Sequence, residues 1–311
     1  MKVSITGANG FLGGNLASFL EKKGFKVLRV QRKEDIGTIN ISDCSKNTNW
    51  SEALVGVDTL IHCASVVHQF KKTSFEYYYQ VNVQGTESLL RQAAKFGVKK
   101  FIFISTIKVN GESSSKEEPF SSASDPNPHD NYSISKLLAE SSIKQISQEL
   151  GIKFVIIRPC LIYGPGVKAN FYKLIKIIDF GIPLPFKNVN NERSILFIDN
   201  ICGFIFNIIK NDKFLNKTYL LADQKSISLS NLINMISKNL RKTNVNFRVS
   251  LKLLRFIFKL FGKKDIAQRL MGSLVIDSFN SYKEIGFDKP LSTEEGIHET
   301  IKWYLKKRKK L

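Results

Sequence analysis

A tyrosine and a lysine stand four positions apart at the start of a stretch with the pattern of a helix. They are Tyr132 and Lys136, in the segment Tyr132-Ser-Ile-Ser-Lys136. Residues at positions i and i+4 share one face of a helix. An ammonium group beside a phenol favours the phenolate and lowers the pKa of the tyrosine. The pair therefore predicts a phenolate that accepts a proton near neutral pH.

Two hydroxyl residues come before this helix, at the end of an apolar run. The predicted strand Lys100–Ser105 ends in one of them, and Thr106 follows it. Ligands bind at the carboxyl edge of a parallel sheet, so both hydroxyls belong near Tyr132. We predict that one of them hydrogen-bonds the oxygen that the tyrosine deprotonates, and we favour Thr106 over Ser105 for this role.

Three glycines form a turn near the first residue. The segment Thr6–Gly13 lies between a predicted strand and a predicted helix. Gly7 permits a tight turn, Gly10 lets a pyrophosphate approach the backbone, and Gly13 lets the helix pack closely on the sheet. The free N–H groups of the helix N-terminus then face the phosphates. We predict a bound nicotinamide dinucleotide here, with Lys136 holding its ribose.

The residues after the second predicted strand discriminate between the two nicotinamide dinucleotides. An acidic residue there binds the ribose hydroxyls of NAD, whereas an arginine suits the extra phosphate of NADP. Here Gln31 is followed by Arg32 and Lys33, and the first acid is Glu34. Arg32 favours NADP, while NAD stays open because the same residues also suit a basic surface.

Short β-branched runs alternate with helical stretches through the first half of the chain, which predicts a parallel, doubly wound sheet. Glycines stand where helix C-caps are expected, at Gly24, Gly97 and Gly151. The predicted strands are Lys2–Thr6, Lys26–Gln31, Asp58–Cys63, Lys100–Ser105 and Lys153–Arg158, and the predicted helices are Phe11–Lys23, Phe75–Phe96 and Tyr132–Leu150.

The rhythm of the chain changes after Pro159, where helices dominate. We expect an α/β fold in which residues 1–163 form a Rossmann-type dinucleotide-binding domain and residues 164–311 form a smaller, mainly helical substrate-binding lobe. Residues 196–222 are expected to return to the sheet as one more helix and strand. The Ser- and Pro-rich loop Ser113–Asp130 is expected at the rim of the site.

Composition limits the class of protein. The chain has 311 residues, of which 43% are hydrophobic, so it buries a substantial core. Its net charge of +20 favours anionic partners: phosphates, nucleic acid or an acidic membrane surface. The four cysteines and four histidines show no metal-ligand spacing, so we expect reduced thiols and no metal. Without a signal peptide or membrane-spanning run, we expect a cytoplasmic protein.

In their order along the chain, the motifs resemble the extended short-chain dehydrogenase/reductase family, the NAD-dependent epimerase/dehydratase group. That family includes 4-epimerases, dehydratases and 4-keto reductases of nucleotide sugars. The matching segments cover nearly the whole length and are specific for the family, not for one reaction. They are Gly7–Gly13, His62–Ser65, Asn82–Thr86, Phe101–Gly111, Tyr132–Lys136, Arg158–Pro165, Arg193–Asn200, Leu291–Gly296 and Trp303–Tyr304.

The resemblance implies a role for each matching residue. Thr106, Tyr132 and Lys136 would form the catalytic triad. Asn170 and Arg193 would bind the diphosphate of a nucleotide-diphosphate sugar, a task that suits a guanidinium group. The cofactor contacts that it implies are Gly7, Asn9, Gly10, Phe11, Leu12, Gly13, Arg32, Ala64, Asn82, Ser105, Tyr132 and Lys136.

Two departures from the family pattern narrow the reaction. Dehydratases of the family carry Asp-Glu directly after the threonine, to eliminate water. Here Ile107 and Lys108 follow Thr106, so we expect no dehydration. The tyrosine that usually precedes Gly111 is Asn110, which leaves open how the sugar ring is held.

The sequence thus predicts an NAD(P)-dependent 4-epimerase of a UDP-hexose or UDP-N-acetylhexosamine, acting through a 4-keto sugar. The alternative is an NADPH-dependent 4-keto reductase of a UDP-6-deoxy-N-acetylhexosamine in surface-polysaccharide synthesis, a branch that Ser105–Glu112 resembles. The intact Tyr132 and Lys136 disfavour a non-catalytic cofactor sensor. Nucleic-acid binding is disfavoured because no RNA-binding or recognition-helix motif accompanies the charge.

Two basic segments are left. In Leu251–Phe261, three cations fall on one helical face, namely Lys252, Arg255 and Lys259. The simpler interpretation is a lobe helix packed on the core. The alternative is peripheral contact with an anionic bilayer or a polyprenyl-diphosphate-linked sugar. We interpret the tail Lys306–Lys310 as a solvated helix end.

The resemblance also implies a homodimer. Members of the family often pair two helices from each copy into a four-helix bundle. The helices predicted at Phe75–Phe96 and Tyr132–Leu150 would form it here.

Overall fold

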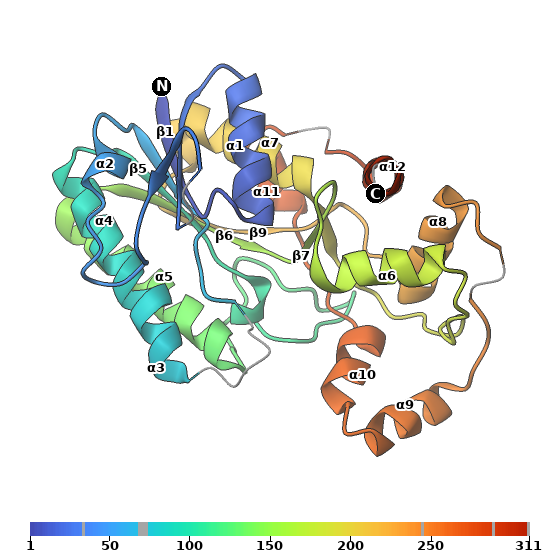
Figure 1. Ribbon diagram of the computed structural model, residues 1–311. Helices are drawn as coiled ribbons and strands as arrows, with labels where there is room; N and C mark the ends of the chain where they lie inside the picture. Colours follow the sequence, from blue (N-terminus) through green and yellow to red (C-terminus); the bar gives the residue numbers. More distant parts are fainter. Residues whose placement is uncertain (33–34, 68–73, 244–245, 288–289, 310–311) are drawn as a thin grey trace.

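The computed structural model describes residues 1–32, 35–67, 74–243, 246–287 and 290–309 (Figure 1). Lys33 and Glu34, which entered the comparison of NAD with NADP, and Lys310 of the basic tail lie outside these ranges.

Within the described residues, seven strands form one parallel sheet in the order β3-β2-β1-β4-β5-β6-β9. The order reverses between β1 and β4, the switch point at which such sheets bind ligands. This confirms the predicted Rossmann-type fold, and the predicted strands end within one residue of the observed ones. The strands are β1 (Lys2–Thr6), β2 (Lys26–Gln31), β3 (Thr38–Asn40), β4 (Thr59–His62), β5 (Lys100–Ile104), β6 (Lys153–Pro159) and β9 (Lys217–Leu221).

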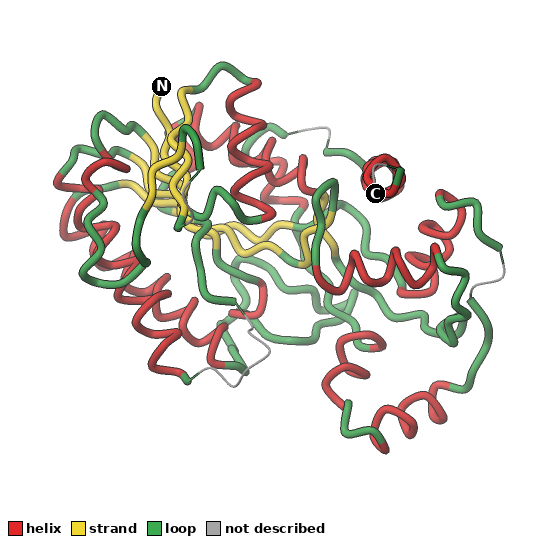
Figure 2. Tube along the Cα trace, viewed as in Figure 1, coloured by secondary structure: helices red, strands yellow, loops and turns green. Residues whose placement is uncertain are grey.

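Helices cover both faces of this sheet (Figure 2). On one face, α1 (Phe11–Lys22) packs beside α7 (Ile198–Lys210), and their apolar side chains join the larger core cluster. On the other, α2 (Ser51–Leu54), α4 (Gly85–Lys95) and α5 (Asn131–Leu150) enclose a second cluster. Neighbouring strand residues alternate between the two clusters, which is why the strands read as continuous apolar runs.

The helix predicted at Phe75–Phe96 is continuous but not uniform. It begins as α3 (Phe75–Tyr78), passes through the π-helical segment η1 (Tyr79–Gln84) and continues as α4. A π-helical turn inserts extra backbone into a helix, and it occurs most often at functional sites. Here the turn carries Asn82, one of the predicted cofactor residues, and buries it.

The helical second lobe of the prediction is also present. A two-stranded parallel sheet links it to the first half, with β7 (Leu161–Tyr163) beside β8 (Ile195–Phe197). The predicted return to the main sheet occurs through α7 and β9, since β9 pairs with β6. The helices of the lobe are α6 (Ala169–Asp179), α8 (Leu229–Asn239), α9 (Leu251–Leu260), α10 (Lys264–Met271), α11 (Phe279–Glu284) and α12 (Thr293–Arg308). Two short 3-10 turns, η2 (Ile107–Val109) and η3 (Asp212–Phe214), complete the assigned elements.

Helix ends follow the glycine pattern of the sequence. Gly24, Gly97 and Gly151 all have positive φ, as the predicted C-caps require. Across the described parts of the chain, we find no helix that is both long and apolar enough to cross a membrane.

Candidate active site

The glycine turn lies at the switch point of the sheet, in contact with the residues that follow β4. Gly7 has a φ of +69°, and a Cβ atom there would lie 2.8 Å from the backbone nitrogen of Ala64. A Cβ atom at Gly13 would overlap the carbonyl oxygen of Gly7. The turn therefore tolerates no side chain at these positions, so a phosphate can approach its backbone and the N-terminus of α1 closely.

A cavity of about 500 Å³ opens above this turn. That volume lies within the usual range for cofactor sites, and the bare backbone of the turn suits a pyrophosphate, so the residues present fit a dinucleotide. Its lining includes the predicted residues Gly7, Asn9, Gly10, Phe11, Leu12, Gly13, Arg32 and Ala64. The sequence did not predict other lining residues, among them Ile41, Asp43, Cys44, Ser45, Tyr77, Gln80 and Val81.

Asp43 is the most informative of the residues that the sequence analysis missed. Its carboxylate accepts hydrogen bonds from the Thr48 hydroxyl and from the backbone N–H of Ser45, the latter over 3.2 Å. These bonds, the one from Thr48 above all, lower the pKa of Asp43. The cavity thus has an acidic group near its arginine, Arg32. It was missed because β3, the strand before it, has only three residues and gives no clear periodic signal.

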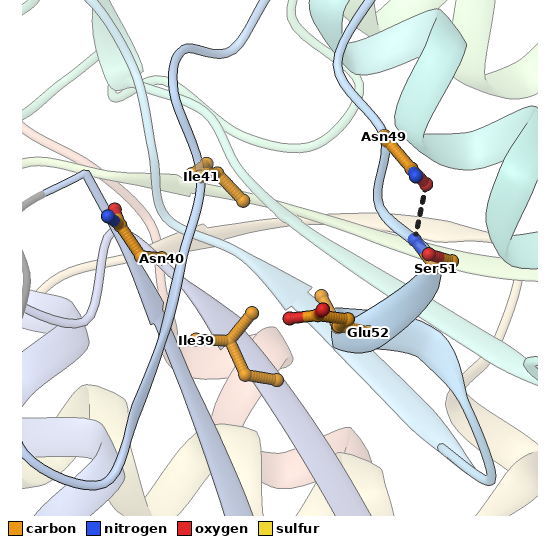
Figure 3. A pocket seen from close by; sticks show the side chains of 7 residues that line it. Ile39, Asn40, Ile41, Asn49, Ser51 and Glu52 are labelled. Atoms are coloured by element: carbon orange, nitrogen blue, oxygen red, sulfur yellow. Dashed lines mark hydrogen bonds between the residues drawn. The ribbon is translucent and has the colours of Figure 1, made fainter.

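A smaller hollow of about 160 Å³ lies between β3 and α2 (Figure 3). The backbone N–H of Ser51 donates to the Asn49 side chain across 3.0 Å at its edge. Ile41 lines both this hollow and the larger cavity. The hollow is too small for a nucleotide, and we assign it to the wall of the cofactor cavity.

Tyr132 and Lys136 both lie in the first turns of α5, which Asp130 caps. The lysine is almost completely buried, and its Nζ atom lies 3.8 Å from the centre of the Phe103 ring. Burial lowers the pKa of Lys136 to about 7, and the carboxylate of Glu140 opposes this effect. Lys136 therefore titrates near neutral pH, which is unusual for a lysine.

The structure corrects one expectation about Tyr132. Its pKa is raised, because burial of the phenol dominates and the charge of Asp130 adds to it, while a hydrogen bond with Ser65 opposes them. The predicted lowering of this pKa by Lys136 is not observed. The physical reason is that desolvation of the phenolate outweighs the attraction of a cation that burial itself makes partly neutral.

The two hydroxyls after β5 have different environments. The Ser105 hydroxyl donates to the buried carboxylate of Glu140, which also accepts three hydrogen bonds from Arg158. Thr106 is half-buried, and its hydroxyl oxygen accepts from the backbone N–H of Lys108 over 3.4 Å. The serine is thus part of an internal ion-pair network, which favours Thr106 for contact with a substrate.

Asn110, which stands where the family usually carries a tyrosine, has a structural environment of its own. Its side-chain oxygen accepts from Arg158 over 3.0 Å, and its amide donates to the carbonyl of Ser124 over 3.1 Å. The residue is 2% exposed. Asn110 therefore ties the polar rim loop to the centre of the sheet instead of presenting a ring to the sugar.

The side chain of Asn82 joins two segments of the chain by hydrogen bonds. Its side chain exchanges hydrogen bonds with the backbone of Val66, accepts one from the Ser65 hydroxyl, and donates to Ser135 of α5 over 3.0 Å. The amide thus joins the loop after β4 to the helix that carries Tyr132. The π-helical turn of η1 is what places this side chain at that junction.

His62, at the end of β4, contacts Thr6, the residue that precedes the glycine turn. Its ring nitrogens lie 2.7 Å from the Thr6 hydroxyl and 3.2 Å from the Thr86 hydroxyl. Burial, with a smaller contribution from Lys136, lowers the pKa of His62 to about 3. The imidazole is therefore neutral and positions β1 against β4.

The predicted substrate residues lie in the second lobe. Asn170 is exposed in the first turn of α6, where free N–H groups favour an anion. Arg193 lies just before β8, and its Nη1 donates to the carbonyl of Gly272 over 3.1 Å. Burial lowers the pKa of Arg193, and the neighbouring cation Arg269 adds to this effect. Two guanidinium groups near each other suit a diphosphate.

Metal ligands are not gathered at this site. Among the described residues, no group of three or more His, Cys, Asp or Glu side chains is arranged to hold a metal ion.

Comparisons with known proteins agree with this geometry. The chain is 33% identical over 312 residues to a UDP-glucose 4-epimerase of Vibrio cholerae, covering 97% of this chain and 95% of that protein. It is 27% identical to an N-acetyl-alpha-D-glucosaminyl-diphospho-ditrans,octacis-undecaprenol 4-epimerase of Escherichia coli O157:H7, covering 97% and 94%. A UDP-glucuronic acid 4-epimerase from Bacillus cereus, solved with NAD, has the same fold, with a TM-score of 0.80 at 20% identity and 98% and 99% coverage.

A sequence model of one family matches residues 3–222, which is most of the chain and includes the glycine turn, the triad and Arg193. The chain therefore belongs to the NAD dependent epimerase/dehydratase family.

Proposed function

We propose that this protein is an NAD-dependent 4-epimerase of a nucleotide-diphosphate sugar, a UDP-hexose or UDP-N-acetylhexosamine. One observation carries the proposal: the triad of Thr106, Tyr132 and Lys136 is intact in a chain that shares 33% identity along its length with a UDP-glucose 4-epimerase. The relatives that act on 4-positions of sugar diphosphates support the same reaction.

In this proposal Tyr132 accepts the proton of the sugar 4-hydroxyl, and Thr106 hydrogen-bonds the same oxygen. A nicotinamide dinucleotide held at the glycine turn would supply the hydride chemistry at C4, by which the sugar is oxidised to the 4-keto form and reduced again on its opposite face. Lys136 would hold the ribose of the bound cofactor. The raised pKa of Tyr132 means that binding of a positively charged nicotinamide is needed to favour the phenolate.

Lys108 supports epimerisation over dehydration. It occupies the position at which dehydratases of the family carry their glutamate, and its ammonium lies 2.5 Å from Asp130 and 3.1 Å from Glu112. Lys108 thus places an ammonium group, engaged by two carboxylates, where those dehydratases carry a carboxyl group that transfers protons. The loss of water from the sugar has no acid–base pair at this position.

NAD is the cofactor that we propose, and Asp43 supports it. The carboxylate of Asp43 lines the cavity and can accept hydrogen bonds from the adenosine end of the dinucleotide, whereas it would repel an additional phosphate. Arg32 lines the same cavity and is the feature that favours NADP. The description of the family names NAD and so agrees with the proposal of NAD over NADP.

The direct test is to incubate the purified protein with UDP-glucose, and separately with UDP-N-acetylglucosamine, and to follow the 4-epimers by chromatography. For at least one of the two sugars, we expect the substrate and its 4-epimer to be interconverted in both directions without added reductant. A Tyr132→Phe variant that still binds the nucleotide sugar is the control for background conversion. If neither sugar is converted and a 4-keto-6-deoxy sugar is instead reduced at the expense of NADPH, the epimerase proposal is wrong.

Release of the cofactor separates the same alternatives. An epimerase keeps its cofactor through both half-reactions, so denatured protein should release NAD into the supernatant, identified by mass spectrometry. Protein that is purified empty and binds added NADPH would favour the reductase that the sequence left open.

We further propose a cytoplasmic homodimer that supplies sugars for surface polysaccharide. In support, α4 and α5 pack side by side, and Phe75, Leu138 and Leu150 on this helical layer keep more than a third of their surface exposed. A second copy would cover them in a four-helix bundle. Light scattering tests this: the native protein should have twice the mass of a Leu138→Glu variant.

A further inference from the structure

Helix α9 carries an apolar face that the rest of the described chain does not cover. Leu254 is buried and anchors the helix. Four other side chains, spaced i, i+3, i+4 and i+7, form one stripe along the helix and are exposed. They are Leu253 at 50%, Phe256 at 62%, Ile257 at 39% and Leu260 at 72%.

The stripe continues around the turn between α9 and α10. Phe261 is 69% exposed, Gly262 makes the turn with a φ of +65°, and Ile266 on α10 is 43% exposed. Ala267 and Met271 of α10 are buried and hold this second helix to the lobe. Figure 1 shows the two helices together at the lower right, at the end of the lobe farthest from the sheet. We call residues 251–271 the helical hairpin.

A row of cations borders the apolar stripe. Lys252, Arg255 and Lys259 share a second face of α9 and are exposed, and the exposed Lys263 follows the helix. Among the side chains that the structure describes, no carboxylate pairs with these four. The sequence explains why: between Asp223 and Asp265 it has ten Lys and Arg residues and no Asp or Glu. Within the described residues, the apolar stripe therefore lies beside a row of cations that has no carboxylate partner.

We propose that the helical hairpin binds the surface of an anionic lipid bilayer. The apolar stripe would enter the boundary between head groups and acyl chains, and the cationic row would lie against the lipid phosphates. This occupant fits both rows at once. A second copy of the chain would place a cationic row against another, and an ordinary protein partner would have to match a uniformly cationic border. The proposal does not depend on the epimerase assignment.

The position of the hairpin relates it to the candidate site. Helix α10 ends at Met271, and the next residue, Gly272, accepts the hydrogen bond of Arg193. Arg269 of the same helix is the cation that affects the pKa of Arg193. A bound hairpin would thus place Arg193, the predicted diphosphate-binding arginine, close to the membrane surface.

Flotation of the full-length protein with vesicles tests the proposal. We expect the protein to float with vesicles of phosphatidylcholine mixed with phosphatidylglycerol, to float less with phosphatidylcholine alone, and to be released as salt is raised. The double variant Phe256→Ser, Leu260→Ser should bind the mixed vesicles about tenfold or more weakly, because it removes exposed apolar surface. The matched control is Phe279→Ser, Leu161→Ser, since these residues are similarly exposed, at 64% and 54%, on other elements.

The cationic row has its own variant and control. Replacing Lys252, Arg255 and Lys259 by Gln should abolish the preference for anionic vesicles. Replacing Lys306, Lys307 and Lys309 by Gln removes the same charge from the C-terminal helix and should preserve that preference. Thermal unfolding establishes that each variant is folded. Failure of the native protein to float, or flotation of the hairpin variants like the native protein, would overturn the proposal. So would a change in oligomeric mass of the hairpin variants without a change in vesicle binding.

Discussion

The sheet edge that forms the candidate site and the helical hairpin differ in how they treat polar and apolar groups. At the site, buried polar side chains such as Asn82, Ser105 and Glu140 are engaged by other parts of the chain. In the hairpin, apolar side chains face solvent and cations lack carboxylate partners within the described chain. The first region is preorganised by contacts within the chain, as catalysis requires. The second presents apolar surface that no other described part of the chain covers.

The largest expected effect is at the centre of the preorganised region. Tyr132→Phe removes the proton acceptor and should lower kcat for 4-epimerisation by about a thousandfold, within the range known for general acid–base groups. Its Tm should change little, since the ring remains. The control is Tyr78→Phe, because the Tyr78 ring lies 6.4 Å from that of Tyr132 and loses the same atom. If both variants lost kcat to a similar extent, the loss would come from altered packing of the rings and not from proton transfer.

The ion pair of Glu140 and Arg158 tests whether the site region depends on internal partners. Both side chains are almost fully buried, with the Arg158 Nη2 atom 2.5 Å from the carboxylate. Glu140→Gln leaves a buried arginine without its counter-ion and should cost about 3–5 kcal/mol in the free energy of unfolding. On the same helix, Glu149 forms an exposed pair with Arg91, so Glu149→Gln should cost less than about 1 kcal/mol. Equal costs in urea titrations would contradict the contrast.

A smaller effect depends on pH and comes from His62. Its pKa in the folded protein is about 3, below the ordinary value of 6.5. Between these values the unfolded chain binds a proton that the folded protein does not, so stability falls as pH falls through this window. One proton corresponds to about 1.4 kcal/mol per pH unit.

The variant His62→Gln lacks this titration and keeps a polar group between Thr6 and Thr86. The difference in unfolding free energy between the native protein and the variant should therefore shrink as pH is lowered from about 6 to about 4. A difference that stays constant with pH would show that His62 binds a proton as readily in the folded protein as in the unfolded chain.

The comparison also shows what the sequence could predict. The glycine turn, the strands and the YxxxK pair follow from local patterns, and their positions were predicted to within a residue or two. The contacts of the site were not, because they join distant segments. Nothing near Asn110 in the sequence indicates that it binds Arg158, and nothing near Glu140 indicates that it competes for the Ser105 hydroxyl.

The sequence pattern does not predict the effect of desolvation on the pKa of a side chain. The spacing of Tyr132 and Lys136 predicts a lowered tyrosine pKa, but burial raises it. Burial depends on what packs over a residue, and Phe103, which covers Lys136, comes from another strand. In the hairpin, the sequence correctly predicts three cations on one face of the helix. It does not predict that the apolar stripe is exposed, because exposure depends on which other segments pack against the helix.

A last contrast in stability lies within α9 itself. Leu253 and Leu254 are adjacent in the chain and about 100° apart around the helix axis, and they are 50% and 3% exposed. Leu254→Ala should cost about 2–3 kcal/mol in unfolding free energy, because it opens a cavity beneath the helix. Leu253→Ala should stay within about 0.5 kcal/mol, because it removes atoms that contact mainly water. If denaturant titrations gave similar costs, the apolar stripe would be packed in the folded protein and would not be open to a bilayer. Unequal costs would show that the stripe contributes little to the stability of the fold, as expected of an apolar surface that is open to contact with a bilayer.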